Sequence, residues 1–338
     1  MRTIEELEDK LSEPSDILVE DISRIKGDLL IIGAGGKMGP SLVKLAVRAI
    51  RKAGLQKKVT AVSRFQKGTL KEELELSGAN VISADLLDDS QIEGLPDTPN
   101  IIYMAGNKFG TTGNEHFTWA MNAYVPGRVA EKFRNSSIVA FSTGNVYPLT
   151  SVGRGGAFET MQPNPIGEYA QSCLGRERIL EYFSRKYEIP MVFFRLNYAN
   201  DLRYGVLLEI AKSVKNHLPI DLSMGHVNVI WQGDANELAI RSLLHASSPP
   251  AVLNITGPET VSVRFAAEYF GEKFQTSPHF VGEEQETALL SNASKANQLF
   301  GYPKVPLFNM MDWTAKWLLE DGILLDKPSH FQERKGAF

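Results

Sequence analysis

The segment Leu29-Leu30-Ile31-Ile32-Gly33-Ala34-Gly35-Gly36-Lys37-Met38-Gly39 decides the fold. Its four leading apolar residues are typical of a strand that is buried on both faces of a parallel sheet. Glycines spaced three residues apart follow, and they let the backbone turn tightly and approach a pyrophosphate without a Cβ in the way. The helical pattern that comes next offers free N–H groups and a positive dipole end to phosphates. We therefore expect a dinucleotide to bind at this loop, with contacts from Gly33, Gly36, Lys37, Met38 and Gly39.

The first two hundred residues alternate between short β-rich runs and longer helical patterns, which predicts an α/β fold with a Rossmann doubly wound parallel sheet. The expected strands are Asp28–Ile32, Lys58–Ser63, Asn80–Ser83, Asn100–Met104, Ser137–Ser142 and Pro190–Leu196. The expected helices between them are Met38–Ala53, Glu115–Arg134 and Pro165–Tyr187.

This rhythm changes near Tyr198, so we predict three parts: an N-terminal helical extension (1–26), a dinucleotide-binding domain (27–197) and a smaller mixed α/β substrate lobe (198–338). Thr3 and Glu6 look like a capping box that opens the first helix. Within the lobe, residues 226–256 are expected to return to the sheet, and the polar tail either docks or stays mobile. The lobe's expected strands are Val227–Trp231 and Val252–Ile255, and its expected helices are Tyr204–Asn216, Gly233–His245, Val261–Phe270 and Phe308–Leu319.

Composition narrows the partners and the compartment. The 338 residues carry a formal charge of −4, which gives no electrostatic reason to expect nucleic acid or an anionic membrane as partner. No apolar run approaches the ~18 residues that cross a bilayer, and the acidic N-terminus is unlike a signal peptide. The single cysteine, Cys173, cannot form an internal disulfide, and no Cys/His cluster has metal-ligand spacing. We therefore expect a cytoplasmic protein without a metal site.

The end of the second strand indicates which nicotinamide cofactor binds. An acidic residue there would hold the ribose 2′-hydroxyl, whereas a basic one suits a 2′-phosphate. The strand ends in Ser63 and Arg64, with Lys67 close behind and no acid between them. This favours NADP over NAD, although Arg64 could instead stack on adenine or face solvent.

Short motifs after the later strands complete the pattern. Ala84-Asp85-Leu86 follows the third strand, Tyr103-Met104-Ala105-Gly106 ends the fourth, and Asn122 lies in the next helix. In this order they resemble the extended short-chain dehydrogenase/reductase family, the NAD-dependent epimerase/dehydratase group, over most of the chain. The resemblance implies further cofactor contacts from Asp85, Leu86, Ala105, Gly106, Asn122 and Leu196.

Two motifs carry the chemistry that the resemblance implies. Phe141-Ser-Thr-Gly-Asn-Val-Tyr147 is similar to the family's Ser-Ser/Thr-x-x-Val-Tyr-Gly strand end, which puts Thr143 at the active Ser/Thr position. Pro165-Ile-Gly-Glu-Tyr169 is similar to the segment with the active tyrosine. Thr143 and Tyr169 are thus candidate catalytic residues, and Tyr169 also lies where this family contacts the cofactor.

The segment after Tyr169 departs from the family. The family's catalytic unit is Tyr-x-x-x-Lys, in which the lysine lowers the tyrosine pKa and holds the nicotinamide ribose. Here the segment reads Tyr169-Ala-Gln-Ser-Cys173, and a thiol cannot supply that charge. A phenol with a pKa of about 10 is largely protonated at pH 7, and a cation within ~4–6 Å normally shifts such a value by ~1–3 units.

Three accounts of this departure remain open. Another cation replaces the lysine: Lys108, in the loop after the fourth strand, is the better candidate, whereas Arg176 lies two helical turns from Tyr169 and reaches less plausibly. Alternatively, Tyr169 acts as a general acid, for which a neutral phenol suffices. Finally, the site has lost its redox chemistry and only binds dinucleotide. Cys173 itself is expected to be a small apolar filler rather than a nucleophile.

Single residues of the second lobe allow both functional and structural interpretations. Asp234 resembles a family position near the substrate, but Asp is also a preferred N-cap, and we favour the cap. Arg203 and Arg264 suit either an anionic substrate or ordinary ion pairs. The sequence shows no basic cluster of the kind expected around a sugar-nucleotide diphosphate.

The leading hypothesis is an NAD(P)-dependent oxidoreductase or epimerase that acts on a sugar or sugar-derived hydroxyl/carbonyl substrate. Thr143 would orient the substrate oxygen and Tyr169 would handle its proton. The rival is a dinucleotide-binding sensor or scaffold without turnover. The resemblance also suggests a homodimer formed through Glu115–Arg134 and Pro165–Tyr187.

Overall fold

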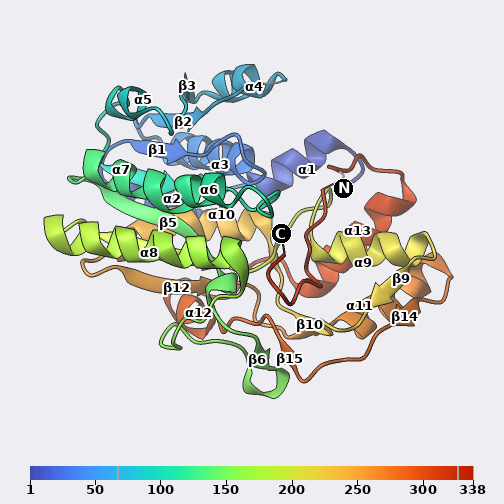
Figure 1. The fold of residues 1–338 in the computed structure, drawn as a ribbon. Helices are drawn as coiled ribbons and strands as arrows, with labels where there is room; N and C mark the ends of the chain where they lie inside the picture. Colours follow the sequence, from blue (N-terminus) through green and yellow to red (C-terminus); the bar gives the residue numbers. More distant parts are fainter. Residues whose placement is uncertain (67, 326, 338) are drawn as a thin grey trace.

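A seven-stranded sheet forms the centre of the molecule in the computed structural model, which describes residues 1–66, 68–325 and 327–337 (Figure 1). Its strand order is β12-β7-β5-β4-β1-β2-β3, and every pairing is parallel. This order reverses beside β1, as in a doubly wound sheet. The strands are β1 (Leu29–Ile32), β2 (Val59–Ser63), β3 (Asn80–Ser83), β4 (Asn100–Tyr103), β5 (Ser137–Thr143), β7 (Met191–Leu196) and β12 (Ala251–Ile255).

The buried strands match the apolar runs of the sequence because both faces of the sheet are covered by helices. In β1, Leu29 and Ile31 point into one core, whereas Leu30 and Ile32 point into the other. The predicted fold class is confirmed, and each of the six expected strands ends within one residue of its expected end.

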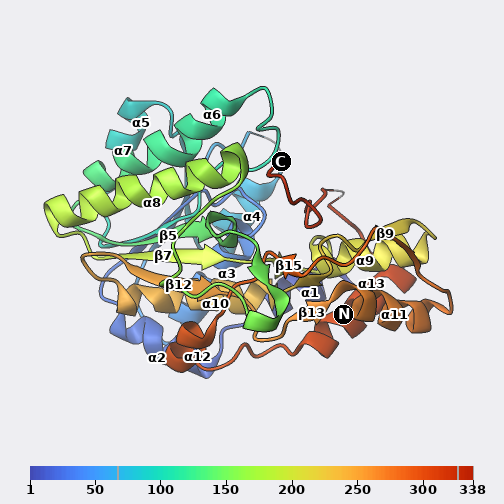
Figure 2. The same ribbon diagram turned by 60° about the horizontal axis from the view of Figure 1, so that its bottom comes forward.

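Helices form one layer on each side of the sheet (Figure 2). One layer contains α2 (Asp16–Arg24), α3 (Gly39–Lys52) and α10 (Gln232–Arg241), which pack on one another. The other contains α7 (Val125–Lys132) and α8 (Gly167–Tyr187), which lie side by side. Two short helices, α4 (Leu70–Ser77) and α5 (Asp89–Glu93), lie near the edge of the sheet that β3 forms (Figure 1).

The expected helix Glu115–Arg134 is interrupted in the structure. It runs as α6 (Glu115–Trp119), a π-helical turn (Ala120–Tyr124) and α7. Pro126 has no N–H to give to the carbonyl of Asn122, four residues earlier, so that carbonyl is open to another donor. The Nε of Arg176, in α8, donates to the Asn122 carbonyl at 3.1 Å and so connects this turn to α8.

A second hydrophobic cluster lies beyond the sheet, at the right of Figure 1. It is built from α1 (Ile4–Leu11), α9 (Val206–Lys215), α11 (Val263–Phe274) and α13 (Leu307–Leu319). At the start of α1, the Thr3 hydroxyl accepts the Glu6 N–H as the capping box predicts, and the Glu6 carboxylate accepts the Arg2 N–H at 2.6 Å.

Two expectations for this part of the chain were wrong. The run Val227–Trp231 is two short strands: β10 (His226–Val227) pairs with β13 (Val261–Ser262), and β11 (Ile230–Trp231) pairs with β8 (Ala199–Asn200). The chain breaks between them because the Asn228 side chain binds the backbone of Glu259 and Ser291.

The second error concerns Asp234, which does not cap α10. It is the third residue of that helix, after the N-cap Trp231, and its Oδ2 accepts the Val305 N–H at 2.9 Å. The carboxylate therefore fixes a distant loop instead of its own helix.

No helix in the described part of the chain is long and apolar enough to span a membrane. The remaining elements of the fold are small. They are α12 (Ser294–Phe300), β6 (Thr150–Ser151), β9 (Pro219–Asp221), β14 (His279–Val281), β15 (Thr287–Ala288) and the 3₁₀ turns Gly144–Val146, Val152–Arg154 and Ser242–His245.

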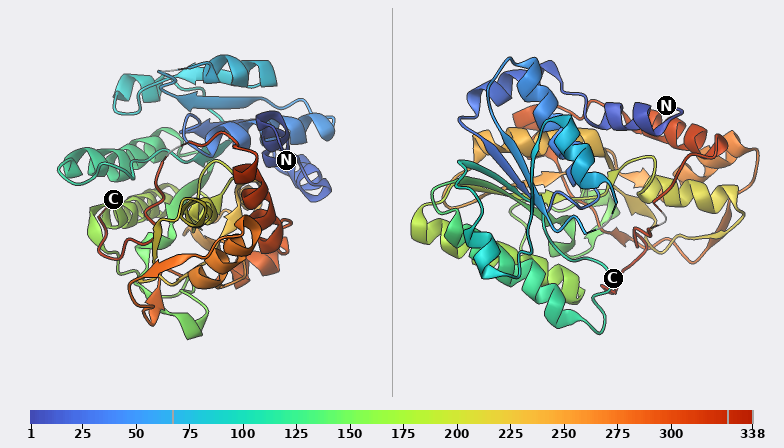
Figure 3. Two further views of the ribbon diagram at one scale, coloured as in Figure 1. Left: turned by 90° about the vertical axis from the view of Figure 1, so that its right-hand side faces the viewer. Right: turned by 90° about the horizontal axis from the view of Figure 1, so that it is seen from above.

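The C-terminal tail docks onto the molecule and connects its two parts (Figure 3). Phe331 is buried in the second cluster, and Arg334 donates to the carbonyl of Thr287 at 2.8 Å. Gly336 then packs so closely on Gly167 that a Cβ on Gly167 would lie 2.3 Å from the Gly336 carbonyl oxygen. The tail thereby reaches the first turn of α8.

Candidate functional site

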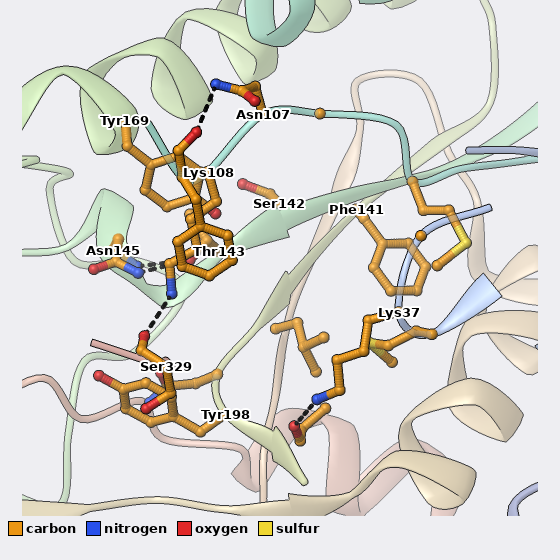
Figure 4. A pocket seen from close by; sticks show the side chains of 18 of the residues that line it. Lys37, Asn107, Lys108, Phe141, Ser142, Thr143, Asn145, Tyr169, Tyr198 and Ser329 are labelled. Atoms are coloured by element: carbon orange, nitrogen blue, oxygen red, sulfur yellow. Dashed lines mark hydrogen bonds between the residues drawn. The ribbon is translucent and has the colours of Figure 1, made fainter. Parts of the chain in front are cut away.

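A cavity of about 490 Å³ opens at the carboxyl ends of β1, β4, β5 and β7, where doubly wound sheets bind ligands. Its walls come from the glycine loop, the loop after β4, the first turn of α8, the start of α9 and the C-terminal tail. In the view of Figure 4, Tyr169, Lys108 and Thr143 lie on one side of this cavity and Lys37 lies on the other.

The three spaced glycines of the loop do different jobs. Gly33 has φ +92°, and a Cβ there would lie 2.5 Å from the Ala105 backbone nitrogen; a Cβ on Gly39 would lie 2.2 Å from the Ala34 oxygen. The protein's own backbone therefore requires both glycines. A Cβ on Gly36 would meet only the Gly33 oxygen, at 3.3 Å, so the space beside it is open to a ligand. The loop fits a pyrophosphate held at the N-terminus of α3.

Most of the cofactor contacts expected from the sequence line this cavity: Gly33, Gly36, Lys37, Met38, Gly106, Asn122, Tyr169 and Leu196. The other expected contacts do not line it. Gly39 begins α3, and Ala105 and Leu86 are buried in the sheet's second core. Ser63 ends β2 beside the glycine loop, where a Cβ on Gly35 would lie 2.6 Å from its Oγ.

The remaining expected contacts lie near the outer strands. Arg64 follows β2 and is exposed, and Asp85, after β3, accepts the Leu87 N–H at 3.1 Å. Lys67 lies outside the described residues.

Lys37 extends away from the glycine loop toward the second part of the molecule. Its Nζ donates to the Ala199 carbonyl at 2.9 Å and lies 3.7 Å from the centre of the Tyr204 ring. Burial lowers the pKa of Lys37 from 10.5 to about 7, although the charge of Asp201 acts in the opposite direction. The sequence placed Lys37 in the cofactor loop but did not indicate this reach.

Thr143 and Tyr169 come together as the motifs predicted. Thr143 ends β5, and its Oγ1 accepts the side-chain N–H of Asn145 at 3.0 Å. Burial raises the pKa of Tyr169 well above its ordinary value of 10, and the neighbouring Cys173 raises it further. Arg176 and a hydrogen bond with Thr143 act against this increase in the Tyr169 pKa. The phenol is therefore protonated at neutral pH.

Lys108 lies beside Tyr169, as the first of the three accounts requires. Its Nζ is 5.9 Å from the centre of the Tyr169 ring and donates to the Ser329 carbonyl at 3.2 Å. Burial lowers the pKa of Lys108 from 10.5 to about 8, with Glu209 acting in the opposite direction. The loop that carries it is anchored by Asn122, whose amide both accepts the Asn107 N–H and donates to the Asn107 carbonyl, each at 2.8 Å.

Cys173 faces a small apolar cluster with Val146, Tyr147 and Ala157. It is 1% exposed, and burial raises the pKa of its thiol. A protonated, enclosed thiol is a packing group, in agreement with the expectation that Cys173 fills space.

Arg176, which the sequence made the less plausible replacement for the lysine, also lines the cavity. It donates from Nη1 to the Phe141 carbonyl at 2.6 Å, and from Nε and Nη2 to the carbonyl and Oδ1 of Asn122 at 3.1 and 3.0 Å. A Cβ on Gly106 would lie 2.5 Å from its Nη2, so a larger residue there would displace the guanidinium.

From the sequence we assigned no role to Tyr204, Lys327 and Ser329, which also line the cavity, or to Asn145, which lies within the Phe141–Tyr147 motif. The two arginines considered for an anionic substrate form ion pairs instead, Arg203 with Asp201 at 2.8 Å and Arg264 with Glu284 at 2.9 Å. No group of three or more His, Cys, Asp or Glu side chains among the described residues could hold a metal ion.

Comparison with known families decides where this fold belongs. The model of the NAD dependent epimerase/dehydratase family matches residues 29–199, from the first strand of the sheet to β8. The chain belongs to this family. Residues 29–199 include the glycine loop, Thr143 and Tyr169, whereas the start of α9 and the C-terminal tail, which also line the cavity, lie outside this match.

Solved structures of similar fold match 86–87% of this chain and nearly all of their own length. Pal from Bacillus thuringiensis is 18% identical with a TM-score of 0.71, over 86% of this chain and 99% of that one. UDP-glucuronic acid 4-epimerase from Bacillus cereus, in complex with UDP-glucuronic acid and NAD, is 18% identical with a TM-score of 0.70, over 87% and 99%. DesIV, a dTDP-glucose 4,6-dehydratase from Streptomyces venezuelae with NAD bound, is 16% identical with a TM-score of 0.72, over 87% and 97%.

These similarities establish a common fold. Comparison with curated protein sequences gives no significant match.

Proposed function

We propose that this protein is a nicotinamide-dependent oxidoreductase or epimerase that acts on a hydroxyl/carbonyl pair of a sugar or sugar-derived substrate. One observation carries the proposal: the open space beside Gly36 and the Thr143–Tyr169 pair line the same cavity. A cofactor held at the loop thus extends toward two groups able to bind and protonate a substrate oxygen. Family membership supports the same class of chemistry.

The dinucleotide would be held along the carboxyl edge of the sheet. The backbone N–H groups of Lys37 and Met38, just before α3, would donate to its pyrophosphate, because those of Gly36 and Gly39 donate to carbonyls within the loop. Ser63, Arg64, Asp85 and Leu86 would border its adenosine end. Gly106, Asn122 and Leu196 border its nicotinamide end. When bound, the nicotinamide supplies or accepts the hydride.

The protein's own groups would manage the substrate oxygen and its proton. Thr143 orients the oxygen, with Asn145 holding the threonine hydroxyl in place. Tyr169 stays protonated because burial raises its pKa, so it donates the proton during carbonyl reduction, as a general acid does. The raised pKa therefore favours the account in which Tyr169 acts as a general acid over one in which Tyr169 is already a phenolate before the substrate binds.

Cys173 stands, in our proposal, at the position of the family's catalytic lysine, and Lys108 supplies the missing positive charge. The Lys108 Nζ lies 5.9 Å from the centre of the Tyr169 ring, and burial lowers the pKa of Lys108 to about 8. A cation there stabilises negative charge that develops on the phenol oxygen as the proton leaves. The buried Cys173 site, in contrast, has no room for a solvated charge.

A second candidate function is dinucleotide binding without turnover, and Cys173 is the observation that favours it. To separate the two, purified protein is incubated with NADPH or NADH and a panel of sugar ketones while the absorbance of the reduced nicotinamide is followed. Turnover supports the enzyme. Cofactor binding with no oxidation across the panel supports the binding protein.

The glycine loop is tested by Gly36→Val, which fills the open space beside the loop without a severe clash. Calorimetry should show cofactor affinity weakened at least tenfold, about 1.4 kcal/mol. Gly153→Val is the matched control, because a Cβ at Gly153 meets nothing within 4 Å and Gly153 does not line the cavity. Unchanged binding in Gly36→Val would refute the cofactor site.

The cation is tested by Lys108→Met and Cys173→Lys. If Lys108 supplies the charge, Lys108→Met abolishes turnover of any substrate found, and Cys173→Lys is neutral or harmful because it puts a second cation into an apolar cluster. If the site is merely degraded, Lys108→Met changes little and Cys173→Lys raises turnover, with a pH profile shifted to lower pH. The second pattern would contradict our assignment of Lys108.

NADP preference is part of the proposal and depends on Arg64. Its exposed guanidinium follows β2 and suits a 2′-phosphate, whereas the solved epimerase and dehydratase named above hold NAD. Arg64→Asp should shift the ratio of the two affinities toward NAD. An unchanged ratio would mean that Arg64 does not read the phosphate.

We also propose a cytoplasmic homodimer with the three-part division predicted from the sequence. Tyr124 and Tyr182 are 51% and 58% exposed on the helices expected to pair, and large exposed aromatic side chains are common at interfaces. Sedimentation of the wild type and of Tyr182→Glu tests the dimer, which should dissociate in the variant.

A further inference from the structure

The cavity is lined by positive charge although the whole chain is negative. Lys37, Lys108, Arg176 and Lys327 line it, and no Asp or Glu does so among its described lining residues. The chain as a whole carries a formal charge of −4. These cations come from four separate segments, which is why the sequence shows no basic cluster.

Two carboxylates that act on these lysines, those of Asp201 and Glu209, are bound by other groups of the protein. Asp201 binds the Arg203 guanidinium at 2.8 Å. Glu209 accepts the backbone N–H of Ser329 and its hydroxyl, the latter at 2.7 Å. Neither carboxylate lines the cavity, although Asp201 acts to raise the pKa of Lys37 and Glu209 acts to raise the pKa of both lysines.

Lys37 and Lys108 are each held by a neutral group of the backbone. Lys37 donates to the Ala199 carbonyl at 2.9 Å, and Lys108 donates to the Ser329 carbonyl at 3.2 Å. Burial is the largest influence on both and lowers the pKa of each. An anion in the cavity would offset this desolvation, because an opposite charge favours the charged form of an amine.

The position of these two lysines points to the substrate rather than to the cofactor's phosphates. The pyrophosphate site is formed by the backbone at the start of α3, and the Lys37 side chain leads away from it toward Ala199 and Tyr204. Lys108 is beside Tyr169, at the reacting end (Figure 4). Lys327 and Ser329 of the tail form the wall opposite the sheet, so the free volume suits a small molecule.

We propose that the substrate is a small acid whose carboxylate or phosphate group is bound by Lys108, with Lys37 as the second cation of the cavity, rather than a nucleoside diphosphate sugar. This inference rests on the proposed function, because it places the reacting hydroxyl or carbonyl at Thr143 and Tyr169. Binding of the acid raises the pKa of both lysines, so it is accompanied by proton uptake at pH 8.

Calorimetry on the dinucleotide-saturated protein tests this with three matched probes: glucose, gluconate and glucose 6-phosphate. We expect at least one acid to bind at least tenfold more tightly than glucose, with a heat that varies with the ionisation enthalpy of the buffer at pH 8. Lys108→Met and Lys37→Met should each weaken that binding at least tenfold. Lys316→Met, at an exposed position of α13, is the matched control and should leave it unchanged.

Four outcomes would overturn the inference: glucose binds as well as the acids, the lysine variants bind as well as the wild type, the acid binds only without dinucleotide, or neither acid binds. Turnover is followed separately by nicotinamide absorbance. Lysine-dependent acid binding without turnover of any acid or ketone would leave the anion site standing and refute the proposed function. Turnover of neutral sugar ketones without acid binding would do the reverse.

Discussion

The molecule buries positive charge in two contrasting ways. Arg195 of the interior strand β7 donates two hydrogen bonds, of 2.6 and 2.9 Å, to Glu177 of α8, and both residues are 5% exposed or less. In the cavity, Lys37 is held by a carbonyl and lies over an aromatic ring. The first charge has its counter-ion within the protein, whereas the second is held by neutral groups.

The pKa values show what this difference does. Burial acts to lower the pKa of Arg195, but the hydrogen bonds and charge of Glu177 raise that pKa above its ordinary value. The pKa of Lys37 is lowered to about 7, because burial outweighs the attraction of Asp201. A complete ion pair thus belongs to the scaffold, whereas an incompletely compensated cation marks a place for a ligand.

The scaffold side of this comparison predicts the largest effect. Glu177→Gln removes the counter-ion and leaves the Arg195 guanidinium buried without charge compensation, so we expect the free energy of unfolding to fall by about 3–5 kcal/mol. Urea denaturation followed by circular dichroism measures it. Glu181→Gln is the control: its partner Arg185 is at the surface of the same helix, and exposed pairs of this kind contribute about 0–1 kcal/mol.

The double variant Glu177→Met with Arg195→Met sharpens this test. Apolar replacements of similar size remove both charges together, and such pairs are often replaced at little cost. We expect the double variant to be more stable than Glu177→Gln alone. If it is less stable, the Arg195–Glu177 pair contributes more than charge compensation and the contrast with the cavity weakens.

Arg176 stands between the two cases and predicts an intermediate effect. It donates to the Asn122 carbonyl and amide oxygen and to the Phe141 carbonyl, none of them charged. Arg176→Met leaves these oxygens without this donor, which costs about 1–3 kcal/mol for a buried group, while it also removes a buried cation. Net destabilisation of about 1–3 kcal/mol is expected in urea denaturation.

The same substitution should weaken dinucleotide binding, because Arg176 supports Gly106 and the Asn122 turn beside the nicotinamide end. Arg178→Met, on the exposed side of the same helix, is the control for both measurements. A stable Arg176→Met variant with normal cofactor affinity would show that the guanidinium only fills space.

The sequence predicted the parts of this structure that depend on neighbouring residues. Leu29–Gly39 indicated the strand, the turn and the helix start, because buried apolar runs and glycine spacing are local signals. Thr143 and Tyr169 were placed by their motifs at the end of β5 and the start of α8, and both line the cavity. Their catalytic roles, like the domain limits, remain predictions.

What the sequence could not predict depends on contacts between distant segments. The docking of Ser329 against Lys108 joins residues 221 positions apart, and nothing local in the tail indicates it. The Asp234 carboxylate was expected to cap its own helix, but the Val305 N–H, 71 positions away, takes it. Helical spacing alone made Arg176 the less plausible cation. It could not indicate that the Asn122 carbonyl, which Pro126 leaves open, accepts a hydrogen bond from the Arg176 side chain.

The smallest predicted effect has the opposite sign to the others and comes from Lys37. Because its pKa is about 7 in the folded protein, against an ordinary lysine value of 10.5, the unfolded chain binds more protons between pH 7 and 10.5. This lysine therefore makes stability rise with pH across that window and lowers it most at pH 7 and below. Lys37→Met removes the buried charge and keeps the apolar stem. The pKa difference of about 3.5 units (10.5 minus 7), at about 1.4 kcal/mol per unit, sets an upper limit of about 5 kcal/mol on the gain at pH 6. The variant also loses the hydrogen bond to Ala199 and the contact with the Tyr204 ring, so without ligand we expect a net stabilisation of about 1 kcal/mol at pH 6. The gain should shrink toward pH 10, where the wild-type lysine is neutral in the folded state and begins to lose its proton in the unfolded chain. Urea denaturation at pH 6, 8 and 10 measures it, with Lys316→Met as the exposed control. Destabilisation by Lys37→Met at pH 6 that is as large as at pH 10 would mean that the contacts with Ala199 and Tyr204 compensate the charge fully, and Lys37 would then belong with Arg195 to the scaffold.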